Sequence, residues 1–553
     1  MRFKALCVLL LLCGLWPVRA AADNRIIIRS TLSLQALQTA CNPLPLPLLP
    51  QLCHVIGGLG DPQQQLFLIT SPLDLSTLLN LPGNPLGIID AELDQLISLI
   101  GGVIQPLTLP LPDSVTAALS DAYNDAYNSA PSDWNGYANQ PAALIVGVQA
   151  AQSQFGVRGS GIVADIDTGV DPNHPAFAGV LLGGGLQLPS YDFTRNQPGA
   201  SELNDLSPDF PTTPHACSGC SPAIVNQSSA AILDQSSAAI LDGNPQYAAF
   251  GHGTMVLGVV HLVAPTAQLL PLKAFSSNGT GNLSDILRAI YYAVQQGNAN
   301  VINMSFDFKT PSTELSKALD YASQQGVVCA ASAGNDGQAE TVYPAALRSD
   351  VMGVASTNDV DQRSYFSNYG NSIVWVDAPG EGIVTTYPFS TYAAGWGTSF
   401  SAPFISGAAA LLWSKSSMNE SSAATAVSHA VYVGPDMGYG RLDLVQALGG
   451  QVVTGDFSIS VSPSRQTIRR GSSGRFTVTT AASGGFTGTV SFSASGLPSR
   501  TSASFRPSSI TASGSSVLTL RVGQHAARGT YTLTITGTSG SSSHSDTATL
   551  TIR

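Results

Sequence analysis

Apolar and polar positions follow three different patterns along the 553 residues. Near the N-terminus the strand-like IIIRS (Ile26–Ser30), QLFLITS (Gln65–Ser71) and GIIDAEL alternate with the helical SLQALQTAC and LSTLLN. This β-α-β-α-β order, with a further strand near Val55, predicts a small α+β module of the ferredoxin-like type over residues 23–101. Residues 102–140 contain Pro, Asp, Asn and Ser with weak periodicity, which predicts a linker with a processing site.

Residues 141–450 alternate apolar runs with helical stretches of small residues. The runs are IVADI, LLPLKAF, NVINMS, VVCAASA and VMGVAST. Strands that alternate with helices predict a mostly parallel sheet in a three-layer α/β domain. A helix is expected from about Ser399, with Pro403 tolerated in its first turn. Within Asp192–Gln246 the octapeptide QSSAAILD occurs twice in tandem, which we interpret as a duplicated surface loop or one short helix.

Residues 455–553 are rich in Ser, Thr and Gly, with apolar residues at every second position. These positions are Phe457/Ile459/Val461, Phe476/Val478, Val490/Phe492, Ala503/Phe505, Leu518/Leu520/Val522, Tyr531/Leu533/Ile535 and Ala548/Leu550/Ile552. Seven short alternating strands in one segment predict an all-β immunoglobulin-like sandwich.

The net charge of the chain and its distribution limit the classes of partner to expect. The net charge of −11 argues against nucleic acid as the main partner. Residues 455–553 hold nine Arg and two Asp without Lys or Glu, a formal charge of +7, so the rest of the chain carries −18. This asymmetry weakly indicates docking on an anionic surface, although a solvated face is the simpler interpretation. The partner of the β-sandwich is not identified.

Residues 1–22 combine the basic MRFK, an apolar segment and small residues at Ala20 and Ala22, as a secretory signal peptide does. The apolar segment is too short to span a membrane, and Gly or Pro interrupts later apolar runs. We therefore expect a secreted protein without a membrane span.

Cysteine usage fits an oxidising compartment. Cys41–Cys53 is predicted to be a disulfide, and Cys217–Cys220 a disulfide rather than half of a zinc site, since no second ligand pair is near. Cys329 lies in an apolar run and is expected to be a buried free thiol.

Four short motifs carry candidate chemistry. Asp167 ends an apolar strand, His252 lies between two glycines at a helix start, and Asn335 lies in the turn after another strand. Carboxyl ends of parallel strands share one edge of a sheet, where open α/β sheets form their sites. A serine nucleophile needs a base, the base needs a carboxylate, and the oxyanion needs N–H donors. Ser399 at a helix start completes that set, although each motif alone also suits a turn or a helix cap.

The motifs DTG, HGT, AGN and GTSxSAP, at Asp167–Gly169, His252–Thr254, Ala333–Asn335 and Gly397–Pro403, resemble those of the subtilisin family of serine peptidases. The resemblance covers about residues 160–450. It implies that Asp167 supports His252 as general base, that Ser399 is the nucleophile and that Asn335 donates to the oxyanion. The residues that it implies for substrate binding are Asn278, Gly279, Gly281, Ser305, Phe306, Asp307, Ala333 and Gly334.

The resemblance also implies a secreted endopeptidase that acts on polypeptides, needs no cofactor for its chemistry and is made as a zymogen. Residues 23–101 would then be an inhibitory propeptide, with a permanent accessory domain as the alternative. The segment after His252 is too short for the usual calcium loop, so a structural calcium is left open and no metal ligand is assigned.

Two other functions stay open. One is a catalytically inactive family member used for binding or adhesion. The other is a narrow-specificity processing protease, because an Asp307 side chain in the specificity pocket would favour a basic substrate residue unless it faces solvent. Asp165 stands where the family usually has an aliphatic residue, which puts two carboxylates on one strand face.

Overall fold

The structure, a computed structural model, describes residues 23–42, 52–99, 114, 135–183, 190–206, 223–225, 230–232, 245–416, 418–449, 456–483, 488–539 and 542–553. Within these ranges no helix is long and apolar enough to cross a membrane. The chain divides into two compact units, with the boundary between Leu448 and Gly449.

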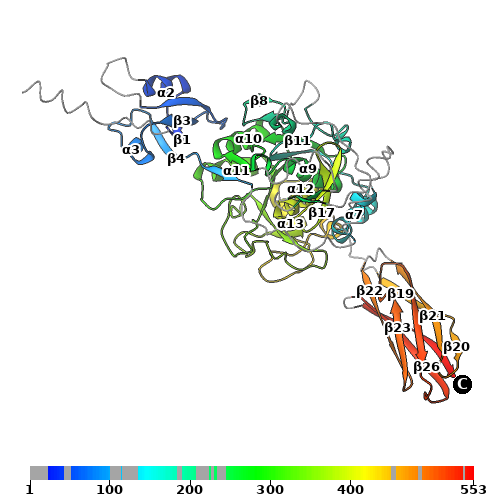
Figure 1. Cartoon of the computed structure of the whole chain (residues 1–553). Coiled ribbons are helices and arrows are strands. Elements are labelled where there is room, and N and C mark those ends of the chain that lie inside the picture. The colour runs from blue at the N-terminus through cyan, green and yellow to red at the C-terminus, as the bar shows by residue number, and fades with distance from the viewer. Residues whose placement is uncertain are drawn as a thin grey trace, which may run out of the picture. The chain divides into compact units, whose positions relative to one another are not determined.

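The first unit begins with an α+β module (blue in Figure 1). Its elements are β1 (Asn24–Ser30), α2 (Leu34–Cys41), β2 (His54–Gly58), β3 (Leu66–Ser71), α3 (Leu75–Leu79) and β4 (Ile88–Leu93). The four strands form an antiparallel sheet in the order β2-β3-β1-β4. This β-α-β-β-α-β order includes both the predicted strands and the further strand near Val55.

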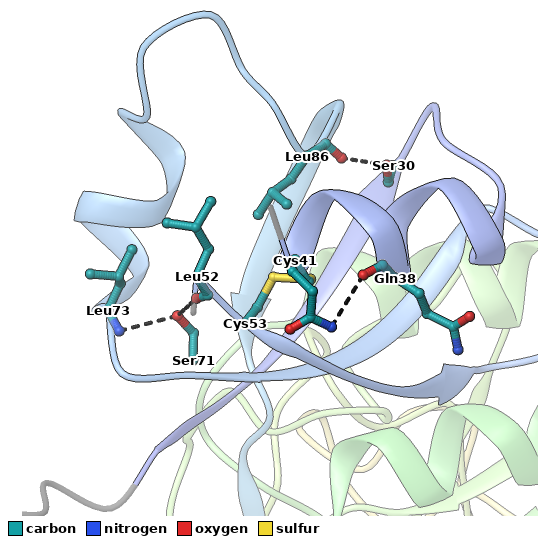
Figure 2. Close-up of a disulfide and its surroundings, with 9 residues drawn as sticks. Ser30, Gln38, Cys41, Leu52, Cys53, Ser71, Leu73 and Leu86 are labelled. Atoms are coloured by element: carbon teal, nitrogen blue, oxygen red, sulfur yellow. Dashed lines mark hydrogen bonds between the residues drawn. A yellow bond between two sulfur atoms is a disulfide. The ribbon is translucent and has the colours of Figure 1, made fainter. Parts of the chain in front are cut away.

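Both faces of this sheet are covered, which explains the unbroken apolar run at its centre. Ile26 and Ile28 pack with Leu37 of α2, whereas Ile27 joins an apolar cluster that contains helices of the following domain. The predicted disulfide Cys41–Cys53 is present and links the end of α2 to the segment before β2 (Figure 2).

An eight-stranded sheet forms the centre of the following domain, in the order β16-β15-β14-β13-β6-β11-β7-β8. All its strands run parallel except β8, which pairs antiparallel with β7. The strands are β6 (Ile162–Asp167), β7 (Tyr191–Asp192), β8 (Gln197–Pro198), β11 (Gln268–Lys273), β13 (Val301–Met304), β14 (Val328–Ser332), β15 (Met352–Thr357) and β16 (Val376–Pro379).

Helices cover both faces of this sheet and give a three-layer architecture. On one face α9 (His252–Val263) and α12 (Thr398–Lys415) share an apolar core with Val163 and other residues of the sheet. On the other face α10 (Leu283–Gln295) and α11 (Thr313–Gln324) pack against Ala164, Ile166 and their neighbours. Alternate residues of the buried strands therefore point into two different cores, which is why these strands read as continuous apolar runs.

Smaller elements complete this domain. They are α5 (Asn135–Ala138), α6 (Pro141–Ile145), α7 (Val148–Phe155), the 3-10 turns Pro175–Phe177, Glu202–Asp205 and Pro245–Tyr247, β5 (Leu96–Ser98) paired with β12 (Thr280–Asn282), the sheet of β17 (Ile383–Tyr387), β18 (Thr391–Gly395), β10 (Ala230–Ile232) and β9 (Ala223–Val225), α13 (Glu420–Val427) and α14 (Leu444–Ala447).

The second unit consists of two sheets around one core. One contains β19 (Asp456–Ser462), β21 (Ser473–Ser483), β25 (Gly514–Val522) and β23 (Thr501–Arg506), and the other β20 (Arg465–Ile468), β27 (Ser542–Ile552), β26 (Gly529–Ser539), β22 (Thr489–Ser495) and β24 (Ser509–Thr511). All seven predicted strands are present, and β20 and β24 are additional. The architecture is compatible with a β-sandwich, and its immunoglobulin-like character stays a prediction.

Three sequence expectations need correction. Pro403 lies in the second turn of α12, because the helix begins at Thr398. The linker ends earlier than predicted, since α5 packs Tyr137 into the core and Gln140 exchanges hydrogen bonds with the backbone of Val384. Ala230–Ile232 of the first octapeptide form strand β10, not a helix.

Four expectations fall wholly or mostly outside the described residues: the signal peptide, the linker of residues 102–140 with its processing site, the Cys217–Cys220 pair and the second copy of the octapeptide. Cys329 is a buried free thiol, as predicted.

Candidate active site

Asp167 and His252 meet at the carboxyl edge of the central sheet. Asp167 is the last residue of β6 and His252 is the first residue of α9. His252 Nδ1 lies 2.8 Å from both carboxylate oxygens of Asp167, and both side chains are buried. Burial lowers the pKa of His252, but the charge and hydrogen bond of Asp167 outweigh it, and the pKa is raised above its ordinary value. The geometry suits a base whose ring is oriented by a carboxylate.

Glycines permit this contact because two backbones meet there. A Cβ on Gly253 would lie 2.1 Å from the carbonyl oxygen of Gly169, so only glycine lets α9 begin directly against the turn after β6. The DTG and HGT motifs are thus two sides of one backbone contact.

Glu202 ties the same turn and helix together, and no sequence pattern indicated it. Its carboxylate accepts hydrogen bonds from Thr254 Oγ1, from Gly251 N at 2.8 Å and from Thr168 Oγ1 at 3.2 Å. Burial raises the pKa of Glu202 to about 7. Glu202 lies within Asp192–Gln246, outside the tandem octapeptides, and neither periodicity nor a motif marked it.

Ser399 lies at the second position of α12, close to the start of the helix. Its Oγ donates to the Ser305 carbonyl at 3.1 Å, while His252 Nε2 has no hydrogen-bond partner among the described residues. The Nε2 atom that would receive the serine proton is therefore buried but holds no competing hydrogen bond among the described residues. A rotation of the serine side chain is needed before the two groups can bond, as is common without substrate.

Pro403 explains a second contact at Ser399. A helical residue at position 403 would donate its N–H to the carbonyl of Ser399, and proline has no N–H. Ser305 Oγ donates to that carbonyl instead, at 2.8 Å. Strand β13 is followed directly by Ser305, so the end of this strand supplies the hydrogen bond that the helix lacks.

Asn335 lies beside the start of α12. Its Oδ1 accepts from Thr398 N at 2.9 Å and from Thr398 Oγ1 at 3.0 Å. These bonds fix the amide orientation and leave its Nδ2 group without a partner among the described residues. An N–H donor next to a serine at a helix start is the arrangement that an oxyanion needs.

The predicted substrate-binding residues Gly279 and Gly281 lie in or next to strand β12, which is paired with an extended segment of the same chain. Strand β12 pairs antiparallel with β5, Gly281 opposite Ile97, and Leu99 N donates to the Gly279 carbonyl at 2.7 Å. The segment before β12 is anchored at the site, because Ala274 N and Phe275 N both donate to the Asp167 carbonyl.

Asp307 does not lie in open solvent. Its carboxylate lies against Gly334, with Oδ2 3.1 Å from the position a Gly334 Cβ would take. Burial and the nearby charges of Asp336 and Glu340 raise the pKa of Asp307 to about 7, against the effect of Lys309. Ser305, Phe306 and Ala333, which are also predicted substrate-binding residues, are buried. The remaining predicted residue, Asn278, caps the turn before β12 through its Oδ1.

Within the described ranges, no group of three or more His, Cys, Asp or Glu side chains is placed to hold a metal ion.

A buried Asp–His pair, a serine at a helix start and an adjacent amide together define the class of site found in serine hydrolases. A family model described as the subtilase family matches residues 159–448. Thermitase from Thermoactinomyces vulgaris is 34% identical over 269 residues, which cover 48% of this chain and 80% of thermitase. The chain therefore belongs to the subtilase family and is a subtilisin-like serine peptidase.

Other relatives share shorter parts. A thermophilic serine proteinase from Bacillus sp. (strain AK1) is 34% identical over 46% of this chain and 53% of its own length. Subtilisin Savinase from Lederbergia lenta is 37% identical over 30% of this chain and 64% of its own length. The crystal structure of a cold adapted subtilisin-like serine proteinase aligns with a TM-score of 0.40 and 26% identity, over 52% of this chain and 90% of that chain.

Proposed function

We propose that this chain is a secreted serine endopeptidase that cleaves polypeptides through Asp167, His252 and Ser399 and is made as a self-processed zymogen. The observation that carries the proposal is the Asp167–His252 contact at 2.8 Å beside a serine at the start of α12. Intact candidates for nucleophile, base and orienting carboxylate favour an enzyme over an inactive binding protein.

In this mechanism His252 Nε2 takes the proton of Ser399 Oγ as the oxygen attacks the substrate carbonyl. Asp167 holds the Nδ1–H tautomer and stabilises the imidazolium. The tetrahedral oxyanion accepts from Asn335 Nδ2 and from the Ser399 backbone N–H, which is among the unpaired donors of the helix start. His252 then protonates the leaving amine, and water attacks the acyl-enzyme by the same route.

Substrate would pair with β12 as an added strand. Leu96–Ser98 already occupies this edge, with Ile97 and Leu99 buried. A segment paired in this way would keep substrate from the β12 edge, which supports an inhibitory role for residues 23–101. We expect self-cleavage within a few residues after Leu99.

The N-terminal module also contacts the first residues of two helices, α10 and α11. Glu92 accepts from Ser312 Oγ and from Thr313 N at the start of α11, and Asp94 accepts from Ser284 N at the start of α10. Carboxylates stabilise helix N-termini by accepting hydrogen bonds from unpaired N–H groups and by lying next to the positive end of the helix dipole. These caps supplied by another module favour an intramolecular inhibitor over an unrelated accessory domain.

The test is expression of the full chain beside Ser399→Ala, with N-terminal sequencing and casein hydrolysis. The wild type is expected to lose the residues up to a point shortly after Leu99 and then to hydrolyse casein, and the S399A variant to stay joined and inactive. Equal processing in both would remove self-cleavage, and a wild type that is folded but inactive would favour the binding-protein alternative.

A narrow specificity is the second candidate. The partly buried Asp307 carboxylate supports it, because a negative charge in the specificity pocket that the family resemblance implies here would attract a basic substrate side chain.

A further inference from the structure

Asp165 lies two residues before Asp167 on the same face of β6 and is 1% exposed. Its neighbours across the sheet are Pro271 on β11 and Asn303 on β13. The proposed mechanism gives Asp165 no role, yet burying a second carboxyl group here costs free energy unless hydrogen bonds compensate for the lost water.

A chain of hydrogen bonds connects Asp165 to the nucleophile. Asn303 Nδ2 donates to Asp165 Oδ1 and to Ser305 Oγ, both at 2.9 Å. Ser305 Oγ in turn donates to the Ser399 carbonyl at 2.8 Å. At the other end of the amide, Ser406 Oγ of α12 donates to Asn303 Oδ1 at 2.8 Å.

Each bond in this chain has a fixed direction. The Ser305 hydroxyl has one hydrogen and gives it to Ser399, so it must accept from Asn303. Both amide hydrogens of Asn303 are then used only if Asp165 offers an acceptor. An aliphatic residue at this position would leave a buried amide hydrogen unpaired and would remove one of the bonds that orient the amide.

We propose that Asp165 is a positioning residue: through Asn303 and Ser305 it holds the Ser399 carbonyl, whose helical donor is lost to Pro403, and so fixes the start of α12. This role rests on the proposed peptidase function. Asp165 acts as a neutral acid, accepting through Oδ1. Its Oδ2 has no hydrogen-bond partner in the described part of the chain, and the ionisable groups that act on it are Asp167 and Glu202. Burial and the charge of Asp167 raise the pKa of Asp165 well above its ordinary value, which agrees with a neutral form.

The test compares D165N, D165L and S305A, each expressed as the full chain and assayed after processing, with S356A as control. D165N keeps a neutral acceptor, so kcat stays within about twofold of wild type and the acid limb of the pH profile does not move. D165L loses the acceptor and S305A breaks the next bond, so kcat per folded molecule falls about tenfold in each with KM unchanged. The double variant D165L/S305A falls no further than either single one, because both break one chain. Ser356, whose buried hydroxyl bonds Ser364, controls for the loss of any buried hydrogen bond.

Unchanged kcat in S305A overturns the proposal, and S305A decides the matter if D165L does not fold. Equal losses in D165N and D165L, or an acid limb shifted to lower pH in D165N, also overturn it, because either result means that Asp165 acts as a charge. A wild type that processes and folds but has no activity removes the proposed function and this role with it.

A stability measurement, which needs no peptidase activity, separates a failure of the proposed function from a failure of the role proposed for Asp165. In the inactive S399A background the wild-type Asp165 takes up a proton on folding above its ordinary pKa of 3.8, so stability falls as pH rises. Adding D165N removes that slope and raises Tm more at pH 8 than at pH 5. An equal effect at both pH values overturns the neutral assignment, whether or not the chain is a peptidase.

Discussion

Replacing Glu92 and Asp94 by alanine tests whether the N-terminal module inhibits through the helix starts of α11 and α10. Each replacement removes a carboxylate that accepts backbone N–H groups, Thr313 N at 3.0 Å and Ser284 N at 2.8 Å. Losing one side-chain cap costs about 1 kcal/mol. The two carboxylates cap different helices, so the costs should add to about 2 kcal/mol, or about a 30-fold weaker complex. The Arg25–Asp94 ion pair adds little, because Arg25 is 40% exposed.

The assay follows hydrolysis of a fluorogenic peptide after processing, when activity appears only as the cleaved module dissociates. Changes at one interface act mainly on dissociation, so E92A/D94A should shorten the lag about 30-fold. D74A is the matched control, because Asp74 caps α3 inside the module through Thr77 N at 2.7 Å. A lag unchanged in E92A/D94A, or equally short in D74A, would show that the caps do not hold the module in place.

Three further results are expected. N335A should lower kcat about 100- to 1000-fold at nearly constant KM in steady-state assays, and a loss under about fivefold would contradict its place at the oxyanion. His252 must be neutral to act as a base, and its pKa is raised above 6.5, so activity should decrease as pH falls through a midpoint above 6.5. The D167N variant removes the charge that raises this pKa, so the midpoint should move to lower pH. An unchanged midpoint in D167N would contradict the pairing of Asp167 with His252. In peptides with Arg or Leu before the scissile bond, preference for Arg should grow as pH rises past the Asp307 pKa of about 7 and disappear in D307N; a pH-independent preference would assign selectivity elsewhere.

The architecture was predictable wherever one physical signal dominated. Period-two alternation located Phe476 and Val478 in β21, and continuous apolar runs located the buried parallel strands, because burial on both faces removes the alternation. Short edge strands such as β20 were missed, since Arg465–Ile468 has one buried position and no repeating pattern.

Some residues of the candidate site could likewise be predicted from the sequence, and others could not. Asp167, His252, Asn335 and Ser399 were singled out because their four motifs together resemble those of one family, and glycines in these motifs lie where backbones approach closely. Glu202 was not, because it reaches the site from an irregular segment and its partners lie far away in sequence. No local pattern encodes a contact that only the tertiary fold creates.

Pro403 shows how a local rule can still point to such a contact. A proline inside a helix leaves the carbonyl four residues earlier without its helical donor, and here that carbonyl belongs to Ser399. A buried acceptor must find a partner, so the proline alone requires a donor from outside the helix. That donor is Ser305, whose hydroxyl is oriented by Asn303 and, behind it, by Asp165. An unusual carboxyl on a central strand and a proline in a helix are thus connected by one chain of hydrogen bonds that ends at Ser399, the proposed nucleophile.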